Sequence, residues 1–569
     1  MNKINNYFKS VPRYVWILMI IVAVGIFFRV YNFHDWMSFN ADGVRDAIAV
    51  SHAVEEGVGE LPLLGPRAGG TQLHLGPIFY YFQYISGTIF QSTSPVVYAF
   101  PNLIFSILAI PLFFLLLRKY FTVRYSLVLT AMLATCFMAI EYSRFAWNPN
   151  STPFFVILFL LSLLRAYDLD EKNDWRKWAW LAVSGGSLAI ASQLHFSAFL
   201  GLPAVLVMFA AINWKKTKKL GWKAVLAFFA TIVIIYIPVF VFEFLTHGKN
   251  AIQFLHAIFS KGPQRGVPDI LLRDIGVFSK YFLWIVSGTI DANWWQKVLG
   301  GIFILTGIFS NIFLLKKETD DGKKRFLKMS AVFMFAFLVL YAPLAFEVNK
   351  TRFFLPLLMT PFIMVGFIVI AAEKIGFSKR KIWIVSLTII FLLIFGNVKS
   401  TFAWFSNMKK SEEGLNLAYQ KVSEKNKEFW WTWGRFKNVA EHMDGNCEKE
   451  NVIFITSKKT KDFGDSIEYA LEEVSRKKVL FKEKYKEDYD KYDSCNYYIS
   501  LAGENIPEFL AQKNYDNPFG MGDMAITRWY PESPGSQDFP KKKSNDRNRS
   551  LQSKIKSDYP RIFWGDLFK

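Results

Sequence analysis

The chain has 569 residues, of which 52% are hydrophobic and 17% aromatic, and it carries a formal net charge of +20. Its apolar residues form repeated runs close to the roughly 20 residues that span a bilayer, which indicates a multi-pass α-helical membrane protein and excludes a soluble one. Much of the Lys and Arg lies in short clusters between these runs, where the positive-inside rule explains it, so we expect no nucleic-acid partner.

The first apolar run, residues 14–31, follows a short basic stretch and lacks a small-x-small cleavage site, so we interpret it as a retained signal anchor with a cytoplasmic N-terminus. The stretch after it begins with Asn40, a good N-cap residue, and places Asp42, Arg45 and Asp46 at i, i+3 and i+4. This pattern predicts a helix on the membrane surface with two acids and one base on one face. The face is either a chemical site or a solvated, self-paired surface.

Residues 75–117 contain no charged residue, and this length fits either two crossings or one crossing and a surface helix. The basic cluster that follows, residues 118–124, should be cytoplasmic, which requires an even number of crossings up to that point. We therefore predict that only residues 101–117 cross back. The aromatic stretch that begins at Gly76 and Pro77 becomes a second interfacial helix on the outer side.

The same alternation continues along the chain and predicts about eleven crossings, with each basic cluster inside and the C-terminus outside. The predicted crossings are residues 14–31, 101–117, 126–140, 152–164, 178–194, 196–212, 225–245, 298–315, 329–346, 353–372 and 382–398. Between the seventh and the eighth lies a long external stretch that ends near Trp295.

After the last crossing the composition becomes that of a soluble domain. Strands are predicted at residues 452–455 and 497–500 and helices at 411–429 and 467–474, which indicates a small extracytoplasmic α/β domain over residues 401–530.

Residues 531–569 are predicted to form a basic, loosely ordered tail, and its run at residues 541–543 either solubilises the chain or touches acidic lipids. Cys447 and Cys495 both fall in the external domain and are either free or joined by a disulfide. No His or Cys spacing fits a closed zinc site.

Over roughly residues 10–400, this arrangement resembles the GT-C glycosyltransferases, and more closely family 39, which includes bacterial lipid A aminoarabinose transferases and protein O-mannosyltransferases. The predicted transmembrane catalytic domain is residues 1–400. Asp42 stands at the essential Asp of the family's first-loop motif. Gly43 replaces the usual second acid, and Asp46 is the residue that could substitute for it.

Other family elements match at the start of the second surface helix and at the predicted outer ends of crossings. The residues that correspond are His74 to Pro77, Tyr142 to Asn150, Gln193 to His195, and Lys350 to Pro356. In the second of these the family often has an acid where Asn148 or Asn150 stands, so this element could position a substrate but not titrate. Topology independently places all of these elements on one surface.

The resemblance implies a polyprenyl-phosphate sugar as donor and a lipid, glycan or protein hydroxyl as acceptor, at the outer face of the plasma (inner) membrane. A phosphate leaves as a stable anion, so the site needs nearby cations and one base, and attack opposite the leaving group inverts the sugar. Asp42 is the expected base. Arg352 and Arg45 are the favoured phosphate ligands because Arg binds phosphate in bidentate geometry.

The remaining candidate substrate ligands are His74, Arg144, Asn148, His195 and Lys350. No cofactor is certain, although Asp42 and Asp46 could hold a divalent cation. Each side chain also has a structural interpretation: His195 as an interfacial histidine, Arg144 as a partner of Glu141, Lys350 and Arg352 as headgroup anchors that snorkel.

Two alternative functions stay open. The stretch from Trp430 to Gly434 looks like the Trp-Trp-Asp-Tyr-Gly element of oligosaccharyltransferase catalytic subunits, but Thr432 stands in place of the acid, and an interfacial aromatic anchor explains the stretch better. A transporter or flippase for lipid-linked sugars would normally carry ionisable residues near mid-membrane. Here the crossings are nearly free of charge, which favours surface chemistry.

Overall fold

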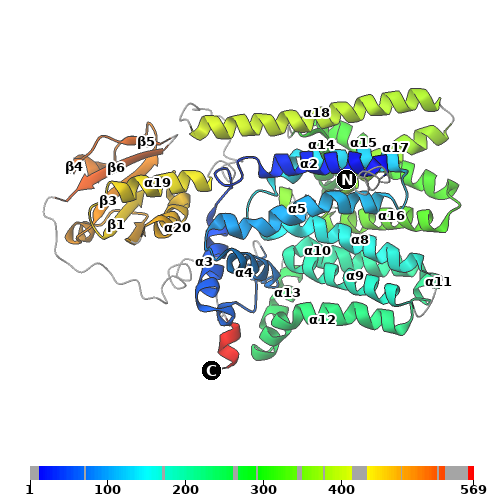
Figure 1. The fold of residues 1–569 in the computed structure, drawn as a ribbon, viewed down its shortest axis with the longest axis horizontal. Coiled ribbons are helices and arrows are strands. Elements are labelled where there is room, and N and C mark those ends of the chain that lie inside the picture. Colours follow the sequence, from blue (N-terminus) through cyan, green and yellow to red (C-terminus); the bar gives the residue numbers. More distant parts are fainter. Residues whose placement is uncertain are drawn as a thin grey trace, which may run out of the picture.

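The computed structural model shows a helical bundle with a small sheet domain at one end (Figure 1). The structure describes residues 12–68, 72–169, 174–259, 267–289, 293–342, 349–375, 378–412, 432–475, 477–521, 524–531 and 562–568. The predicted helix at residues 411–429, the pair Trp430–Trp431 and the basic run at residues 541–543 therefore lie largely or wholly outside the described residues.

Every predicted crossing overlaps a helix of the bundle. The bundle helices are α2 (Arg13–Val30), α3 (Ala41–Glu56), α4 (Ile78–Phe90), α5 (Pro95–Leu117), α6 (Val123–Thr135), α7 (Phe137–Glu141), α8 (Thr152–Asp168), α9 (Trp175–Leu194), α10 (Phe196–Ile212), α11 (Trp214–Thr217), α12 (Trp222–Leu245), α13 (Lys249–Phe259), α14 (Val267–Ser287), α15 (Trp294–Lys317), α16 (Asp321–Tyr341), α17 (Thr360–Lys374) and α18 (Lys379–Glu412).

By length and composition, six helices in the described part of the chain can cross a membrane. They are Arg13–Val30, Pro95–Leu117, Asn148–Asp168, Trp222–Leu245, Trp294–Lys317 and Arg380–Lys409. The chain is thus an integral membrane protein. The total of about eleven crossings and the orientation of the termini stay predictions.

The structure adds two helices, α13 and α14, where the sequence predicted a long external stretch. Phe278 and Phe282 of α14 are buried, with ring centroids 5.3 and 6.4 Å from that of Phe354. Charged residues such as Arg273 and Asp274 interrupt the apolar pattern of α14, so a hydropathy window misses it. In addition, α18 continues beyond the predicted boundary at residue 400.

The C-terminal domain is a mixed sheet covered by helices α19 (Trp433–Gly445) and α20 (Gly464–Val474). Its strands are β1 (Asn451–Thr456), β2 (Lys478–Lys482), β3 (Cys495–Leu501), β4 (Asn514–Tyr515), β5 (Phe519–Met521) and β6 (Met524–Tyr530), in the order β2-β1-β3-β6-β4 with β5 on β6. β1 pairs in parallel with β2 and β3, and β6 is antiparallel to β3. The α/β prediction is confirmed. Of the two alternatives that the sequence left open for Cys447 and Cys495, the structure shows the disulfide.

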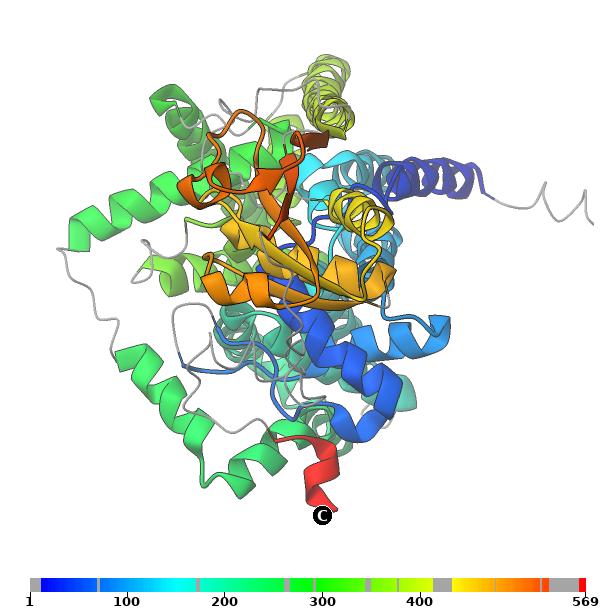
Figure 2. The ribbon, with the colours of Figure 1, turned by 90° about the vertical axis from the view of Figure 1, so that its left-hand side faces the viewer.

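The domain lies over the end of the bundle that carries α3 (Figure 2). The side chain of Trp433 is buried, its ring centroid 5.4 Å from that of Phe39, and its backbone N–H donates to the Met37 carbonyl at 2.7 Å. From α20, Ser466 Oγ donates to the Phe39 carbonyl at 3.1 Å, and Tyr469 packs edge-on against the Phe39 ring. Trp433 is therefore a core residue, and its predicted role as an interfacial anchor is wrong.

Residues 562–568 return to the first loop, where Trp564–Leu567 forms the short helix η9. The N–H of Leu63 donates to the Ile562 carbonyl at 2.9 Å, and the Trp564 indole N–H donates to the Tyr81 hydroxyl at 2.8 Å. The predicted loosely ordered tail is therefore wrong for this segment, in which Ile562 and Trp564 pack against the cluster of Leu63, Leu64 and Phe242.

Candidate functional site

The first turn of α3 holds the acidic residues that the sequence pattern brought together. Asn40 caps the helix through its side-chain oxygen, which accepts a hydrogen bond from the Gly43 N–H at 3.1 Å. The Arg45 guanidinium then bridges both acids: Nη1 lies 2.7 Å from Asp42 Oδ1, and Nη2 lies 2.8 Å from Asp46 Oδ1. The cap and the i, i+3 and i+4 spacing produce this network locally.

Asp46 is the buried member of the network. It is 0% exposed, and its Oδ1 also accepts a hydrogen bond from the Tyr80 hydroxyl of α4 at 3.1 Å. Its Oδ2 is buried and has no hydrogen-bond partner among the described residues. Burial raises the pKa of Asp46 to about 6, although the Arg45 charge opposes this shift. Asp46 therefore holds Arg45 and α4 in place and is not accessible to an acceptor.

Asp42 is the accessible member. Its side chain is 44% exposed, compared with 19% for Arg45. Only its Oδ1 is bonded to Arg45, so Oδ2 can accept a proton from a bound hydroxyl. A divalent cation between Asp42 and Asp46 would have to displace Arg45, and the described residues contain no group of three His, Cys, Asp or Glu side chains that could hold a metal.

A second polar group forms where α9 meets α10 and where the 3-10 helix η4 (Thr351–Phe354) begins. The Arg352 guanidinium lies 5.9 Å from the centroid of the Trp147 ring and 5.7 Å from that of Phe353. Arg352 makes no salt bridge or hydrogen bond with the described residues. It is thus a cation, held by aromatic rings, with its donors open to an anion. Lys350, two residues earlier, is exposed.

His195 lies beside Arg352 and is buried. Its Nδ1 accepts a hydrogen bond from the Ser197 N–H at 3.3 Å, which caps α10, and its ring stands edge-on to Phe353 with centroids 5.1 Å apart. Burial and the Arg352 charge lower the pKa of His195 to about 3. The imidazole is therefore neutral at pH 7 and supplies no charge to a phosphate.

The start of α4 links the two groups. The Ile78 N–H donates to the Gln193 side-chain oxygen at 3.2 Å, and the Gln193 amide N–H donates to the Ile235 carbonyl at 3.0 Å. Gly76 lies so close that a Cβ there would overlap the Gln193 amide. The Nδ1 atom of His74 lies 2.9 Å from the Gly65 carbonyl oxygen, and the backbone N–H of His74 donates to the Asn250 side-chain oxygen at 2.8 Å. His74 therefore shapes the loop before α4.

Two candidate ligands are occupied elsewhere. The Arg144 guanidinium donates to the carbonyls of Phe28, Arg29 and Asn32 at 3.3, 2.9 and 3.1 Å. Arg144 thus caps the end of α2. Its guanidinium is not placed to bind a substrate phosphate and does not pair with Glu141. The Asn148 amide donates to the Leu194 carbonyl at 2.7 Å and ties the two loops together. Arg45, paired with two carboxylates, likewise has fewer donors for a phosphate than we expected.

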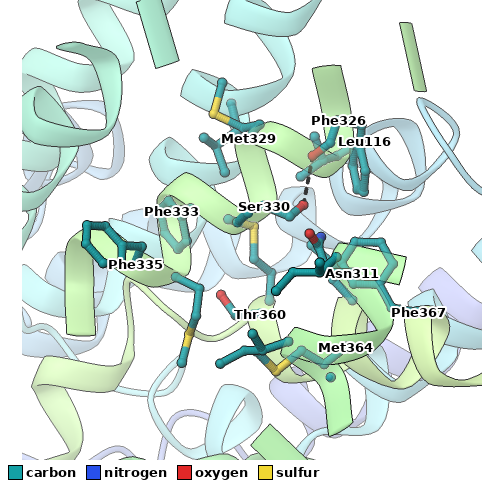
Figure 3. A pocket seen from close by; sticks show the side chains of 18 of the residues that line it. Leu116, Asn311, Phe326, Met329, Ser330, Phe333, Phe335, Thr360, Met364 and Phe367 are labelled. Carbon is teal, nitrogen blue, oxygen red and sulfur yellow. Dashed lines mark hydrogen bonds between the residues drawn. The ribbon is translucent and has the colours of Figure 1, made fainter. Parts of the chain in front are cut away.

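The bundle also contains an apolar cavity of about 250 Å³ between α15, α16 and α17 (Figure 3). Asn311, Ser330 and Thr360 supply its few polar atoms, and Phe326, Phe333 and Phe367 are among the rings around it. None of its lining residues is acidic or basic. It therefore holds no base or phosphate ligand and is separate from the polar groups at the α3 end.

Comparisons with known proteins point to one fold. A family model described as dolichyl-phosphate-mannose-protein mannosyltransferase matches residues 74–242. The structure is similar to that of ArnT from Cupriavidus metallidurans in the apo state, with a TM-score of 0.53, 10% identity and coverage of 90% of this chain and 97% of that one. The chain has the GT-C fold.

Two further solved structures are similar to this one. ArnT from Cupriavidus metallidurans bound to undecaprenyl phosphate gives a TM-score of 0.51 at 11% identity, covering 93% of this chain and 100% of that one. The Archaeoglobus fulgidus oligosaccharyltransferase in complex with Zn and sulfate gives 0.50 at 14% identity, covering 85% and 68%. No curated protein matches the sequence.

Sequence reasoning missed two contributors to the candidate site. Tyr80, which bonds Asp46, is one aromatic residue among several in α4, and no local pattern marks it. Trp147, under Arg352, lies inside a noted element, but its pairing with Arg352 spans some 200 residues. Only the fold brings such residues together.

Proposed function

We propose that this GT-C protein transfers a sugar from a polyprenyl-phosphate carrier to an acceptor hydroxyl at the outer face of the membrane. The observation that carries the proposal is the half-exposed Asp42 on α3, with one oxygen on Arg45 and the other open. It is supported by the GT-C fold and by the structural similarity to ArnT bound to undecaprenyl phosphate.

In this mechanism Asp42 Oδ2 accepts the proton of the attacking hydroxyl. Arg45 holds the carboxylate in one orientation, and buried Asp46 and Tyr80 hold Arg45. The acceptor oxygen attacks the anomeric carbon opposite the phosphate, so the configuration inverts and the phosphate leaves as an anion without a proton donor.

The phosphate is best placed near Arg352. Its guanidinium has no acidic partner among the described residues, whereas Arg45 has two, so Arg352 is the stronger attraction for an incoming anion. Lys350 adds charge beside it, and neutral His195 fixes Phe353 under the guanidinium. Because Arg45 already fills the space between the two acids, we propose that transfer needs no divalent cation there.

The test uses the full chain in nanodiscs with labelled polyprenyl-phosphate sugars and extracted acceptors. We expect Asp42→Asn to lower the turnover by about 10²–10⁴-fold. Glu56→Gln, which removes a charge from the exposed end of the same helix, should leave it unchanged. Arg352→Gln should raise KM for the donor, and EDTA should have no effect.

Full transfer by Asp42→Asn would refute the assignment of the base. Movement of the labelled carrier across the bilayer, with no transfer to any acceptor, would instead support a transporter of lipid-linked sugars. Loss of activity in EDTA that Mg²⁺ or Mn²⁺ restores would refute the metal-independent mechanism.

A further inference from the structure

The α5–α6 loop lies at the end of the bundle opposite α3 (Figure 1). Residues of this end line a polar cleft of about 900 Å³ that is separate from the site described above. It lies between the α5–α6 loop, the start of α16, the end of α17 and the start of α18. Four cations line it, Arg118, Arg124, Lys323 and Arg380, together with one acid, Glu373. We call it the basic cleft.

The charge of the basic cleft is not compensated by the protein. Arg124, Lys323 and Arg380 are exposed, and their side chains form no salt bridge or hydrogen bond with the described residues. Glu373 accepts a hydrogen bond from the Tyr125 hydroxyl. Cations at the same end outside the cleft behave differently, since Lys119 and Arg325 both pair with Asp168. The cleft therefore attracts an anion.

The backbone of α6 adds to this attraction. Thr122, Val123 and Arg124, at the start of this 13-residue helix, line the cleft, and the Thr122 side chain does not cap it. The first N–H groups of α6 are thus open to an oxygen ligand. Guanidinium groups and helix N–H groups together are the donors that bind phosphate.

The surroundings of the cleft indicate a lipid and not a soluble phosphate. Aromatic side chains form part of its lining, and one of them, Tyr120, is held by stacking on Phe326 with ring centroids 5.8 Å apart. Trp383 lies at the other side, 5.4 Å from the Tyr125 ring. Beyond Arg380 and Trp383, α18 exposes Ile384 and Val385. An apolar, exposed helix face beginning at the cleft suits acyl chains, with the aromatic rings at headgroup level.

We propose that the basic cleft binds the headgroup phosphate of an anionic phospholipid, whose acyl chains lie along α18. Positive charge at the cytoplasmic boundary attracts anionic lipids, and a cleft between helices selects one headgroup from that layer. The bound lipid joins α6, α16 and α18 at one end of the bundle.

The test measures retention of phosphatidylglycerol by the purified full chain, by native mass spectrometry and by titration into detergent. The cleft variant combines Arg124→Gln, Lys323→Gln and Arg380→Gln. The matched control combines Lys215→Gln, Lys218→Gln and Lys219→Gln, which removes the same charge from the exposed turn around α11. We expect the cleft variant to lose affinity at least about tenfold and the control to stay near the original value.

Equal binding by the cleft variant would overturn the proposal, as would an equal loss in the control, which would indicate general charge attraction. Phosphatidylcholine should not bind. Displacement of phosphatidylglycerol by millimolar inorganic phosphate would show a soluble-phosphate site and would overturn the assignment to a lipid. Because the readout is lipid retention, the result is independent of any transfer activity.

Discussion

Replacing Gly76 by Ala tests how the loop before α4 is joined to α9. The new Cβ would overlap the Gln193 amide, so this side chain must rotate away. Rotation breaks its hydrogen bonds to the Ile78 N–H and the Ile235 carbonyl. At about 1 kcal/mol for each bond, and about 1–3 kcal/mol for a buried amide left unpaired, we expect a loss of about 3–5 kcal/mol in unfolding free energy.

A double-mutant cycle makes this expectation specific. Gln193→Ala alone should cost about 2 kcal/mol, because the same two hydrogen bonds are lost. In the double variant the methyl group introduced at position 76 enters space that Gln193 has vacated, so the second substitution should add little. Unfolding in detergent, followed by Trp fluorescence in denaturant, gives the four free energies. Additivity within about 0.5 kcal/mol would refute the proposed contact between the two residues.

Three further outcomes are expected. The pKa of Asp46 is higher in the folded protein than in the unfolded chain, so protonation of Asp46 stabilises the fold at low pH, and this stability is lost as pH rises through about 6. Relative to Asp46→Asn, the unfolding free energy of the protein should therefore increase by about 1.4 kcal/mol from pH 7.5 to pH 5. A difference between the two proteins that stays constant with pH in denaturant titrations would contradict this. Arg144→Lys should lower the unfolding free energy by about 2–4 kcal/mol, because two buried carbonyls and one part-buried carbonyl lose the guanidinium, while KM for the donor stays unchanged. A raised KM would restore the role of Arg144 as a substrate ligand. Trp564→Phe and Tyr81→Phe should each lower the unfolding free energy by about 1 kcal/mol, and the double variant should lose no more than either single variant, because both substitutions remove the same hydrogen bond. Additive losses would show that this hydrogen bond contributes nothing to stability.

The sequence correctly predicted those helices whose signals lie close together in the chain. The Asn40 cap and the spacing of Asp42, Arg45 and Asp46 lie within seven residues, and α3 forms as these signals require. The apolar runs of the crossings are local as well, and each overlaps a helix. Helix α14 was not predicted because its charged residues interrupt the apolar pattern, although its buried face packs on Phe354.

The roles of single side chains were harder to predict. Arg144 stands in an apparent family element, but its partners are carbonyls more than 100 residues earlier. The family resemblance alone favours Asp42 over Asp46 in the sequence, and the burial of Asp46 against α4, which leaves Asp42 as the exposed acid, is visible only in the structure. In the sequence, an Arg at the end of a crossing gives the same pattern whether it binds a phosphate, as Arg352 does in our proposal, or caps a helix, as Arg144 does.

The docking of the C-terminal domain on the first loop bears on the order in which the protein assembles. Phe39 and Ser466 are 427 residues apart, and Tyr81 and Trp564 are 483 apart. A ribosome therefore makes every bundle helix before the residues that hold this loop exist. The acidic turn of α3 has to remain open through the whole of membrane insertion, and the site takes its final shape as one of the last events of synthesis. A chain that inserts correctly but fails to close its domain would accumulate as an inactive membrane protein.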